Sequence, residues 1–427
     1  MANGTMGFNE WQRRSLWIEI GLILLIGLGV YTYSLQFMKG LGVTGLNKPV
    51  FWGLYIANFI FCVGLSAGGI AVSALVHILN KEDMKPVAII AEILSISFLI
   101  LAALFIVLDL GQPTRLFYVI WNANFSSPLL WDVTIINSYL VLCSALLFFS
   151  VRAQVVKSAS GHPGRLFVVR LLTLGYTDVS EASLKRDRRI LKTLAIVSIP
   201  GAVALHSVTA WILGLVKGQP GWNTPILAPL FISSALASGL GGVIVAVWAG
   251  RRLFKIHIED KIIFQLGTFL FLSIPVLAYL LFTEFLTVGY SGSPAHIQVL
   301  EEILWGRFAR IFWFDTIVGI LIPFVLLGLP WTRTPGWIVV ASLLVIIGVF
   351  AERTYLLLPS LMRGGPLDIT NTYSPTNIEW MMMAAAYSAG LLLFLLAGRL
   401  IFPHETREQH AVSAAAHGED KWGFQRG

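Results

Sequence analysis

Two residues with ionisable side chains, Asp132 and His206, stand in stretches of sequence that are otherwise mainly apolar. A carboxylate and an imidazole can hydrogen-bond a pair of carbonyl oxygens and exchange protons with them. Aromatic residues such as Trp131 can form the walls of a pocket for a flat ring. This combination suits a quinone head group, so we interpret Asp132 and His206 as candidate catalytic residues.

The sequence offers little for other redox chemistry. Cys62 and Cys143 form no CxxC or CxxCH motif, so we expect no iron–sulfur cluster, zinc site or c-type haem in this chain. A haem b needs two facing His ligands, and His206 has no obvious partner. No P-loop or dinucleotide-binding motif is present. We therefore expect no metal or haem, and a quinone as the bound substrate.

The composition places these residues in a membrane protein. Of the 427 residues, 56% are hydrophobic and 12% are charged, about half the charged share of a soluble domain. Ten segments are long and apolar enough to cross a bilayer as helices. They lie at residues 17–38, 51–79, 86–110, 129–152, 191–215, 225–249, 261–287, 308–329, 335–358 and 377–401. The sequence thus predicts an all-α polytopic protein with ten transmembrane helices.

Basic residues indicate how the chain is oriented. Twenty-two of the 30 Lys and Arg residues fall in the even-numbered loops and the two terminal segments. Cytoplasmic loops carry such an excess, so we expect both termini in the cytoplasm and the chain in the cytoplasmic (inner) membrane. The net charge of +7 then reflects topology rather than nucleic-acid binding. The cytoplasmic loop 153–190 is predicted to be an amphipathic surface stretch with a basic anchor, or a loop without a further role.

Two sequence patterns recur four helices apart. Gly64–Gly69 in the second helix resembles Ser238–Gly242 in the sixth, and an Asp follows aromatic residues at the start of the fourth and eighth. This predicts a parallel repeat of two four-helix bundles, helices 2–5 and 6–9, with two flanking helices. Chance similarity of apolar segments is the alternative. The expected domains are 1–50 (tail and first helix), 51–224 (first bundle with the quinone site), 225–360 (second bundle) and 361–427 (last helix and tail).

The expected topology places several polar residues of the first bundle near the outer face. Four of them join Asp132 and His206 as candidate quinone-binding residues, namely Asp109, Arg115, Tyr118 and Trp131. Each main candidate also has a structural alternative. Asp109 could cap a loop or pair with Arg115, Asp132 could be an interfacial residue, and His206 could simply bond a backbone carbonyl.

Further ionisable residues are candidates for a proton pathway, because such residues are costly inside a membrane. They are Glu92 near the inner end of the third helix, and Glu284, Asp315, Glu352 and Arg353 in the second bundle. A polar tie between helices is the alternative for Glu92. A structural ion pair is the alternative for Glu352 with Arg353.

Several of these motifs together resemble the NrfD-like family, typified by the polysulfide reductase membrane subunit. They are Phe51-Trp52, Gly64–Gly69, Ser127–Asp132, His206–Val208, Pro220–Trp222, Phe282–Phe285 and Tyr290–Gly292. Within that family the sequence is similar to the ten-helix branch, which includes the large membrane subunits of alternative complex III, the menaquinone reductase complex Qrc, and the Dsr and Hmc complexes. One departure is that eight-helix members carry a His on the second helix, where this sequence has Asn58, Phe59 and Ile60.

The resemblance implies a subunit without a cofactor of its own, which binds a quinone, most simply menaquinone, near the outer (periplasmic) face. It implies an outer-face iron–sulfur partner and further redox subunits, such as a multihaem cytochrome or a molybdopterin protein, and it supports roles for Asp132 and His206. We therefore expect a quinone-interacting membrane subunit of a respiratory oxidoreductase, with coupled proton uptake or translocation. A secondary transporter and a structural membrane anchor are the alternative functions.

Overall fold

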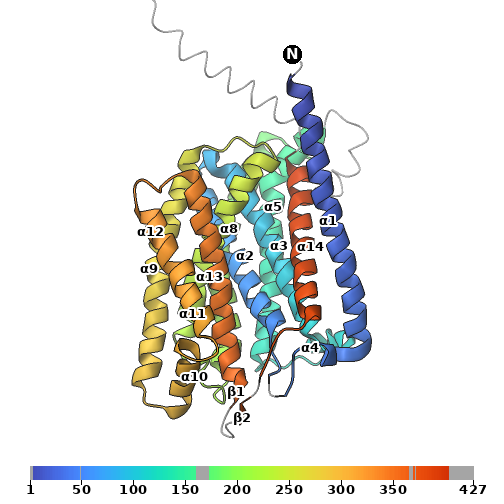
Figure 1. The fold of residues 1–427 in the computed structure, drawn as a ribbon. Coiled ribbons are helices and arrows are strands. Elements are labelled where there is room, and N and C mark those ends of the chain that lie inside the picture. The colour runs from blue at the N-terminus through green and yellow to red at the C-terminus, as the bar shows by residue number, and fades with distance from the viewer. Residues whose placement is uncertain (1–2, 49, 160–172, 365–368, 371, 403–427) are drawn as a thin grey trace, which may run out of the picture.

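Long helices packed side by side dominate the computed structural model, which describes residues 3–48, 50–159, 173–364, 369–370 and 372–402 (Figure 1). In this part of the chain, ten helices are long and apolar enough to cross a membrane, which confirms the predicted number. Nine are continuous: α1 (Asn3–Lys39), α2 (Leu54–Ile78), α3 (Lys85–Asp109), α5 (Pro128–Ala159), α7 (Glu181–Gly214), α8 (Leu227–Leu253), α9 (Asp260–Tyr290), α13 (Pro335–Met362) and α14 (Asn377–Ile401).

The eighth span contains a π-helical segment. It consists of α11 (Ala309–Phe314), the π-helix η5 (Asp315–Leu321) and α12 (Ile322–Gly328). A π-helix is rare and is frequently found at functional sites, and this one begins at Asp315.

The remaining elements are short and lie in connections between the long helices. They are η1 (Gly40–Val43), η2 (Glu82–Met84), η3 (Pro113–Arg115), α4 (Tyr118–Trp121), α10 (Pro294–Leu304) and the antiparallel pair β1 (Arg363–Gly364) and β2 (Ile369–Thr370). The sequence did not predict α4 or α10, because both are too short or too polar to stand out among the membrane-length apolar runs.

The connection between α5 and α7 is shorter than predicted. α5 continues to Ala159 and α7 begins at Glu181, so the basic cluster of residues 185–189 lies on a helix rather than in a loop. Ser180 caps α7 by accepting a hydrogen bond from the backbone N–H of Ser183. Residues 160–172 lie outside the described residues, so the predicted surface-lying stretch there stays a prediction.

α2 lies at the centre of the packing. It contacts α3, α7, α8 and α13, and nearly all of its residues are buried. At its crossing with α8, a Cβ on Gly68 would clash with the backbone of Gly239, and the reverse also holds. The two glycine-rich motifs thus pack directly against each other, as small residues allow in membranes.

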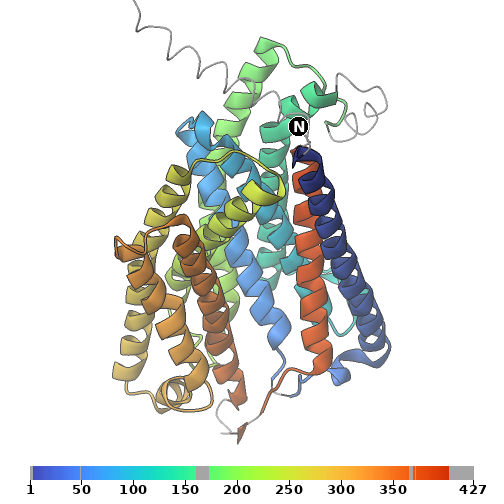
Figure 2. The same ribbon diagram turned by 45° about the horizontal axis from the view of Figure 1, so that its top comes forward.

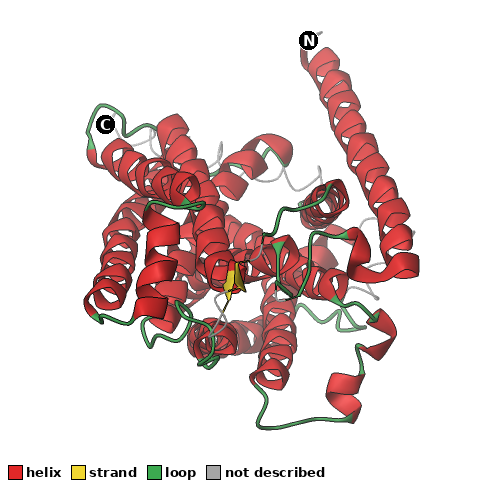
Figure 3. Cartoon of the chain, turned by 60° about the horizontal axis from the view of Figure 1, so that its bottom comes forward, coloured by secondary structure: helices red, strands yellow, loops and turns green. Residues whose placement is uncertain are grey.

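The flanking helices lie together at one edge of the molecule. α1 packs along α14, and α14 packs on α3 (Figure 2). Seen from the other end, α1 forms an outlying edge (Figure 3). Among the remaining helices, α2, α3, α5 and α7 contact one another, as do α8, α9, η5 and α12, and α13. The division into two separate bundles stays an interpretation, because α2 and α8 share an extensive contact between the two groups.

Candidate functional site

Asp132 and His206 occupy neighbouring helices at buried positions. Asp132 lies near the start of α5, and its Oδ1 accepts a 2.7 Å hydrogen bond from the Thr209 hydroxyl of α7. His206 lies three residues before Thr209, so both side chains share one face of α7. Asp132 and His206 are each 3% exposed. The helix pair α5–α7 therefore holds a carboxylate, a hydroxyl and an imidazole together near the predicted outer end.

The imidazole of His206 has one engaged nitrogen and one free nitrogen. Its Nδ1 lies 3.0 Å from the carbonyl oxygen of Ala202, so this nitrogen carries the hydrogen and donates it. In a neutral ring Nε2 is then a hydrogen-bond acceptor. This Nε2 is buried and has no hydrogen-bond partner in the described part of the chain. A buried acceptor without a partner is costly and needs an explanation, and a bound ligand or a proton to be accepted would supply one.

The side chains of the other predicted quinone-binding residues form no hydrogen bond or ion pair with Asp132 or His206 among the described residues. Trp131 is partly exposed, and its indole N–H donates to the carbonyl of Phe125 at 2.6 Å, which fastens the preceding loop. Arg115 and Tyr118 lie exposed in η3 and α4. Their roles stay predictions.

Asp109 is the last residue of α3, and its neighbours are not the residues that surround Asp132 and His206. It lies within electrostatic reach of Tyr55 on α2 and Glu379 on α14, and its Oδ1 is buried without a hydrogen-bond partner in the described residues. No ion pair with Arg115 is found in this part of the chain. Asp109 thus belongs to a polar cluster where α2, α3 and α14 meet.

Glu92 is the centre of a buried polar cluster at the opposite end of the first helices. Its Oε1 accepts hydrogen bonds from Ser73 at 2.6 Å and Ser150 at 3.0 Å, and lies 2.9 Å from Nε2 of His77. Glu92 is 0% exposed and its Oε2 has no partner among the described residues, whereas the side chain of His77 is 11% exposed. A buried carboxylate is thus linked to a ring that reaches the surface.

Sequence reasoning missed Ser73, His77 and Ser150. The spacing of Ser73 and His77, four residues apart, places them on one helix face and was the available signal. Ser150 lies on a third helix, α5, and no sequence pattern connects it with the other two.

The second group of helices contains another buried network. The Tyr355 hydroxyl donates to Oδ2 of Asp315 at 2.7 Å, across from α13 to the π-helix η5. Arg353 lies 3.6 Å from Glu352, donates to the Ser234 hydroxyl of α8, and stacks its guanidinium on the ring of Phe231 at 4.0 Å. Asp315, Glu352 and Arg353 are each at most 2% exposed. Asp315 also interacts electrostatically with Glu352 and Arg353, so three of the four predicted residues of this group form one electrostatic network.

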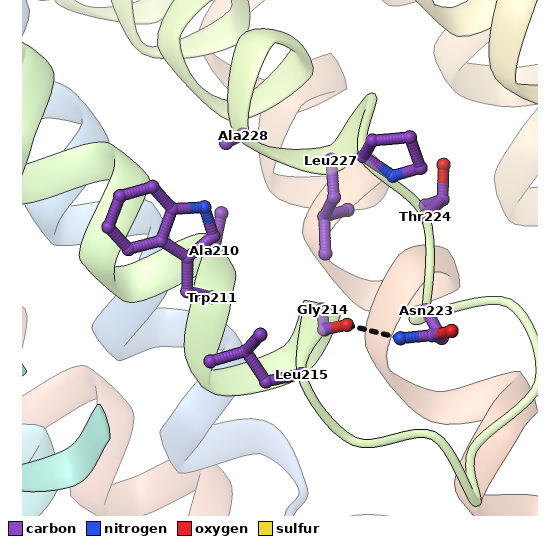
Figure 4. Close-up of a pocket in the computed structure, with 9 residues that line it drawn as sticks. Ala210, Trp211, Gly214, Leu215, Asn223, Thr224, Leu227 and Ala228 are labelled. Carbon is purple, nitrogen blue, oxygen red and sulfur yellow. Dashed lines mark hydrogen bonds between the residues drawn. The ribbon is translucent and has the colours of Figure 1, made fainter. Parts of the chain in front are cut away.

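Glu284 forms no hydrogen bond with this network among the described residues. Its Oε2 accepts a 2.8 Å hydrogen bond from the Thr224 hydroxyl, in the connection between α7 and α8. Thr224 also lines a cavity of about 280 Å³ between the end of α7 and the start of α8 (Figure 4). The walls of the cavity are Ala210, Trp211, Gly214 and Leu215 of α7, residues 223–225, and Leu227 and Ala228 of α8.

The described residues contain no group of three or more His, Cys, Asp or Glu side chains that could hold a metal ion. Cys62 and Cys143 are buried and free. The expected absence of a metal or haem stays a prediction for the chain as a whole.

Comparisons with known proteins connect this arrangement with one family. The model of the family described as Polysulphide reductase, NrfD matches residues 42–364. A Halobacterium salinarum protein, provisionally named as a dimethyl sulfoxide reductase membrane subunit, is 30% identical, with 94% of each chain covered. A selenate reductase subunit of Mesobacillus selenatarsenatis is 27% identical, with 88% of this chain and 91% of the relative covered. The Hdr-like menaquinol oxidoreductase integral membrane subunit of Archaeoglobus fulgidus is also 27% identical, with 90% and 92% covered.

The predicted resemblance is thereby confirmed, since the family match and these relatives each extend over most of the sequence. The chain belongs to the polysulphide reductase NrfD family of membrane subunits.

Proposed function

We propose that this chain is the quinone-interacting integral membrane subunit of a multi-subunit respiratory oxidoreductase, and that it is not catalytic alone. Its membership of the NrfD family and its similarity to a menaquinol oxidoreductase membrane subunit support this function. They favour menaquinone as the substrate. The ten apolar helices support an integral membrane protein, which we place in the cytoplasmic membrane with both termini in the cytoplasm.

The observation that carries the proposal is the free, buried Nε2 of His206, about one turn of α7 from the Thr209–Asp132 hydrogen bond. A quinol must lose two hydroxyl protons when it is oxidised, and a buried hydrogen-bond acceptor can receive such a proton. Nδ1 of His206 is held by Ala202, so the accepting nitrogen has a fixed direction. Asp132 supplies a second acceptor in the same region, and Thr209 orients its carboxylate.

The proposal requires a partner subunit that exchanges electrons with the quinone, since we expect no redox centre in this chain. An iron–sulfur subunit at the outer face would exchange electrons with the quinone, and multihaem or molybdopterin subunits would extend the path. The site lies in the first helix group, 51–224, near the outer ends of α5 and α7. The second group, 225–360, holds the Asp315–Tyr355 and Glu352–Arg353 contacts.

A proton route from the cytoplasm is the second part of the proposal. The cluster of Glu92, His77, Ser73 and Ser150 supports it, because it joins a fully buried carboxylate to a partly exposed imidazole. Ionisable groups inside membrane helices are costly and are functional candidates by default, and proton relays are one of their roles. Glu284, Asp315, Glu352 and Arg353 are proposed for a corresponding route in the second group.

Substitution of the two central residues tests the quinone site. Asp132→Asn and His206→Ala should each reduce quinone-dependent turnover of the assembled complex by about a hundredfold or more, the usual contribution of a general acid or base. His296→Ala is the matched control, since it removes an imidazole from α10 that bonds Ser293 instead. Turnover is measured in membranes with a menaquinol analogue, after co-purification has shown that the partners remain bound. Wild-type turnover in both variants would reject the site.

A further inference from the structure

The cavity between α7 and α8 ends close to the face of α7 that carries His206. Ala210 lines the cavity and lies four residues beyond His206. These two positions share a helix face and are separated by about 6 Å along the axis. Ala210 is 0% exposed, so it forms the closed inner wall of the cavity, one helical turn from the position of His206. No assigned role accounts for this cavity.

Small side chains keep the space between the two helices open. Ala210 and Gly214 on α7 face Ala228 at the start of α8 across the cavity (Figure 4). A Cβ added at Gly214 would have ordinary contacts, 3.7 Å from the carbonyl oxygen of Trp222 and 3.8 Å from that of Thr224. A methyl group would therefore fit at this lining position, and the glycine leaves that space unfilled.

The outer wall of the cavity suits an apolar molecule that comes from the lipid. Trp211 is 45% exposed and Leu215 is 54% exposed, and both line the opening. The indole N–H of Trp211 has no hydrogen-bond partner among the described residues, and Figure 4 shows this nitrogen on the side of the ring that faces Leu227. An indole beside an apolar wall can stack on a flat ring, and its N–H can donate to a carbonyl oxygen.

The volume limits what can enter. Sites that enclose a whole drug-sized ligand measure about 300–1,000 Å³, and this cavity of about 280 Å³ lies just below that range. It accommodates a ring system of one or two fused rings, whereas a long isoprenoid tail would have to remain outside, in the bilayer.

We infer that this cavity is the lateral passage through which the ring of a quinone or quinol moves between the outer leaflet and His206. The inference rests on the proposed function, because it takes His206 as the destination. Trp211 receives the ring at the opening, and Ala210, Gly214 and Ala228 leave the width that the ring needs. A phospholipid acyl chain that fills the cavity permanently is the competing occupant.

Narrowing the passage is the first test, carried out on the complete complex in its native membrane. Ala228→Trp should lower kcat/KM for a menaquinol with an isoprenoid tail by about tenfold, since added bulk must be displaced each time the ring passes. Leu236→Trp is the matched control. It places the same tryptophan side chain on the exposed side of the same helix, two turns beyond the cavity, and should leave kcat/KM within about twofold.

Photolabelling is the second test and needs no bulky substitution. An azidonaphthoquinone, irradiated in these membranes, should label a peptide within residues 211–228. Trp211→Leu keeps the wall apolar but removes the indole, and should reduce this label several-fold. The label should persist in His206→Ala, because the passage precedes that residue.

The outcomes separate this inference from the proposed function. Equal kcat/KM in Ala228→Trp and Leu236→Trp, or the absence of label from residues 211–228 in an active complex, would overturn the passage and favour a permanent lipid. Wild-type turnover in His206→Ala together with a labelled α7–α8 segment would instead keep the passage and reject His206 as its destination.

Discussion

The Thr209 hydroxyl on α7 lies 2.7 Å from Oδ1 of Asp132 on α5 and 3.0 Å from the carbonyl oxygen of Leu205 one turn earlier. A hydroxyl has a single hydrogen, so these two acceptors share or compete for it. The carboxylate is the stronger acceptor when it is ionised. Thr209 therefore fixes the direction in which Asp132 presents its remaining lone pairs.

Removal of the Thr209 hydroxyl should reduce the activity of the site without abolishing it. Thr209→Val keeps the shape of the side chain, and we expect quinone-dependent turnover to fall by about tenfold, the equivalent of about 1.4 kcal/mol for one hydrogen bond to a charged group. The matched control is Ser207→Ala, because the Ser207 hydroxyl is exposed and bonds the backbone carbonyl of Val203. Turnover in membranes is the measurement. If the two variants behave alike, Thr209 does not position Asp132.

The contact between Gly68 and Gly239 leads to a prediction about stability. Gly68→Ala places a methyl group against the backbone of α8, where no side chain can move aside. We expect a loss of about 1–3 kcal/mol, or a failure to fold, as is usual for overpacking. Gly27→Ala on α1 is the control, since nothing lies within 4 Å of the added methyl group. Melting temperatures in detergent compare the two. Equal melting temperatures would show that the α2–α8 crossing adjusts freely.

The ends of α5 and α7 are joined by a buried ion pair, whose strength is also testable. Arg152 donates to Asp187 and to the carbonyl oxygens of Tyr176 and Asp178, and its side chain is 0% exposed. Asp187→Asn removes the countercharge and should cost about 3 kcal/mol, because a buried guanidinium is left uncompensated.

An exposed ion pair provides the comparison for Asp187. Asp260 pairs with Arg251, but its side chain is 56% exposed. Asp260→Asn should therefore cost at most about 1 kcal/mol. Both variants are followed by thermal unfolding in detergent. A smaller loss for Asp187→Asn than for Asp260→Asn would contradict a stabilising role for the buried pair.

The sequence predicted the ten helices correctly because an apolar run of about 20 residues can cross a bilayer only as a helix, which satisfies its backbone hydrogen bonds internally. Helix ends were less predictable where they leave the membrane. The first turns of α7 are basic and polar, and they resemble a loop until Arg152 and Asp187 are seen to pair. The π-helix at Asp315 was beyond sequence reasoning, because no pattern in an apolar helix marks it; in the structure it contains Gly319, which packs closely against Gly348 on α13.

The ionisable residues of the candidate site were predictable from the sequence, but their hydrogen-bond partners were not. Rare ionisable residues in apolar runs are conspicuous, and this drew attention to Asp132, His206 and Glu92. Their hydrogen-bond partners are not conspicuous. Thr209, Ser73 and Ser150 are ordinary residues in membrane helices, and they acquire significance only from the helix that faces them.

The Glu92 cluster predicts a defect in proton movement that leaves electron transfer in place. Glu92→Gln keeps the shape and one acceptor oxygen, but it replaces the other oxygen with an NH2 donor and removes the titratable charge. In liposomes containing the whole complex, we expect the quinol-driven membrane potential to fall at least twofold relative to turnover, since the route would lose its relay. Glu82→Gln, an exposed substitution in η2 near the same end, is the control. An unchanged potential in Glu92→Gln would remove this cluster from the route.

The second helix group makes the complementary prediction. Tyr355→Phe removes the hydroxyl that donates to Asp315 and leaves the ring packed against Phe312. Because neither Asp315 nor Tyr355 forms a hydrogen bond with His206 among the described residues, we expect quinone-dependent turnover at zero membrane potential to stay within about twofold of wild type. If protons also cross this group, the potential built up per quinol oxidised should fall, because the buried carboxylate loses its hydrogen-bonded neighbour. The same liposome assay measures both quantities. A fall in Glu92→Gln alone would restrict proton movement to the first group, whereas a fall in Tyr355→Phe alone would assign it to the network of Asp315, Glu352 and Arg353.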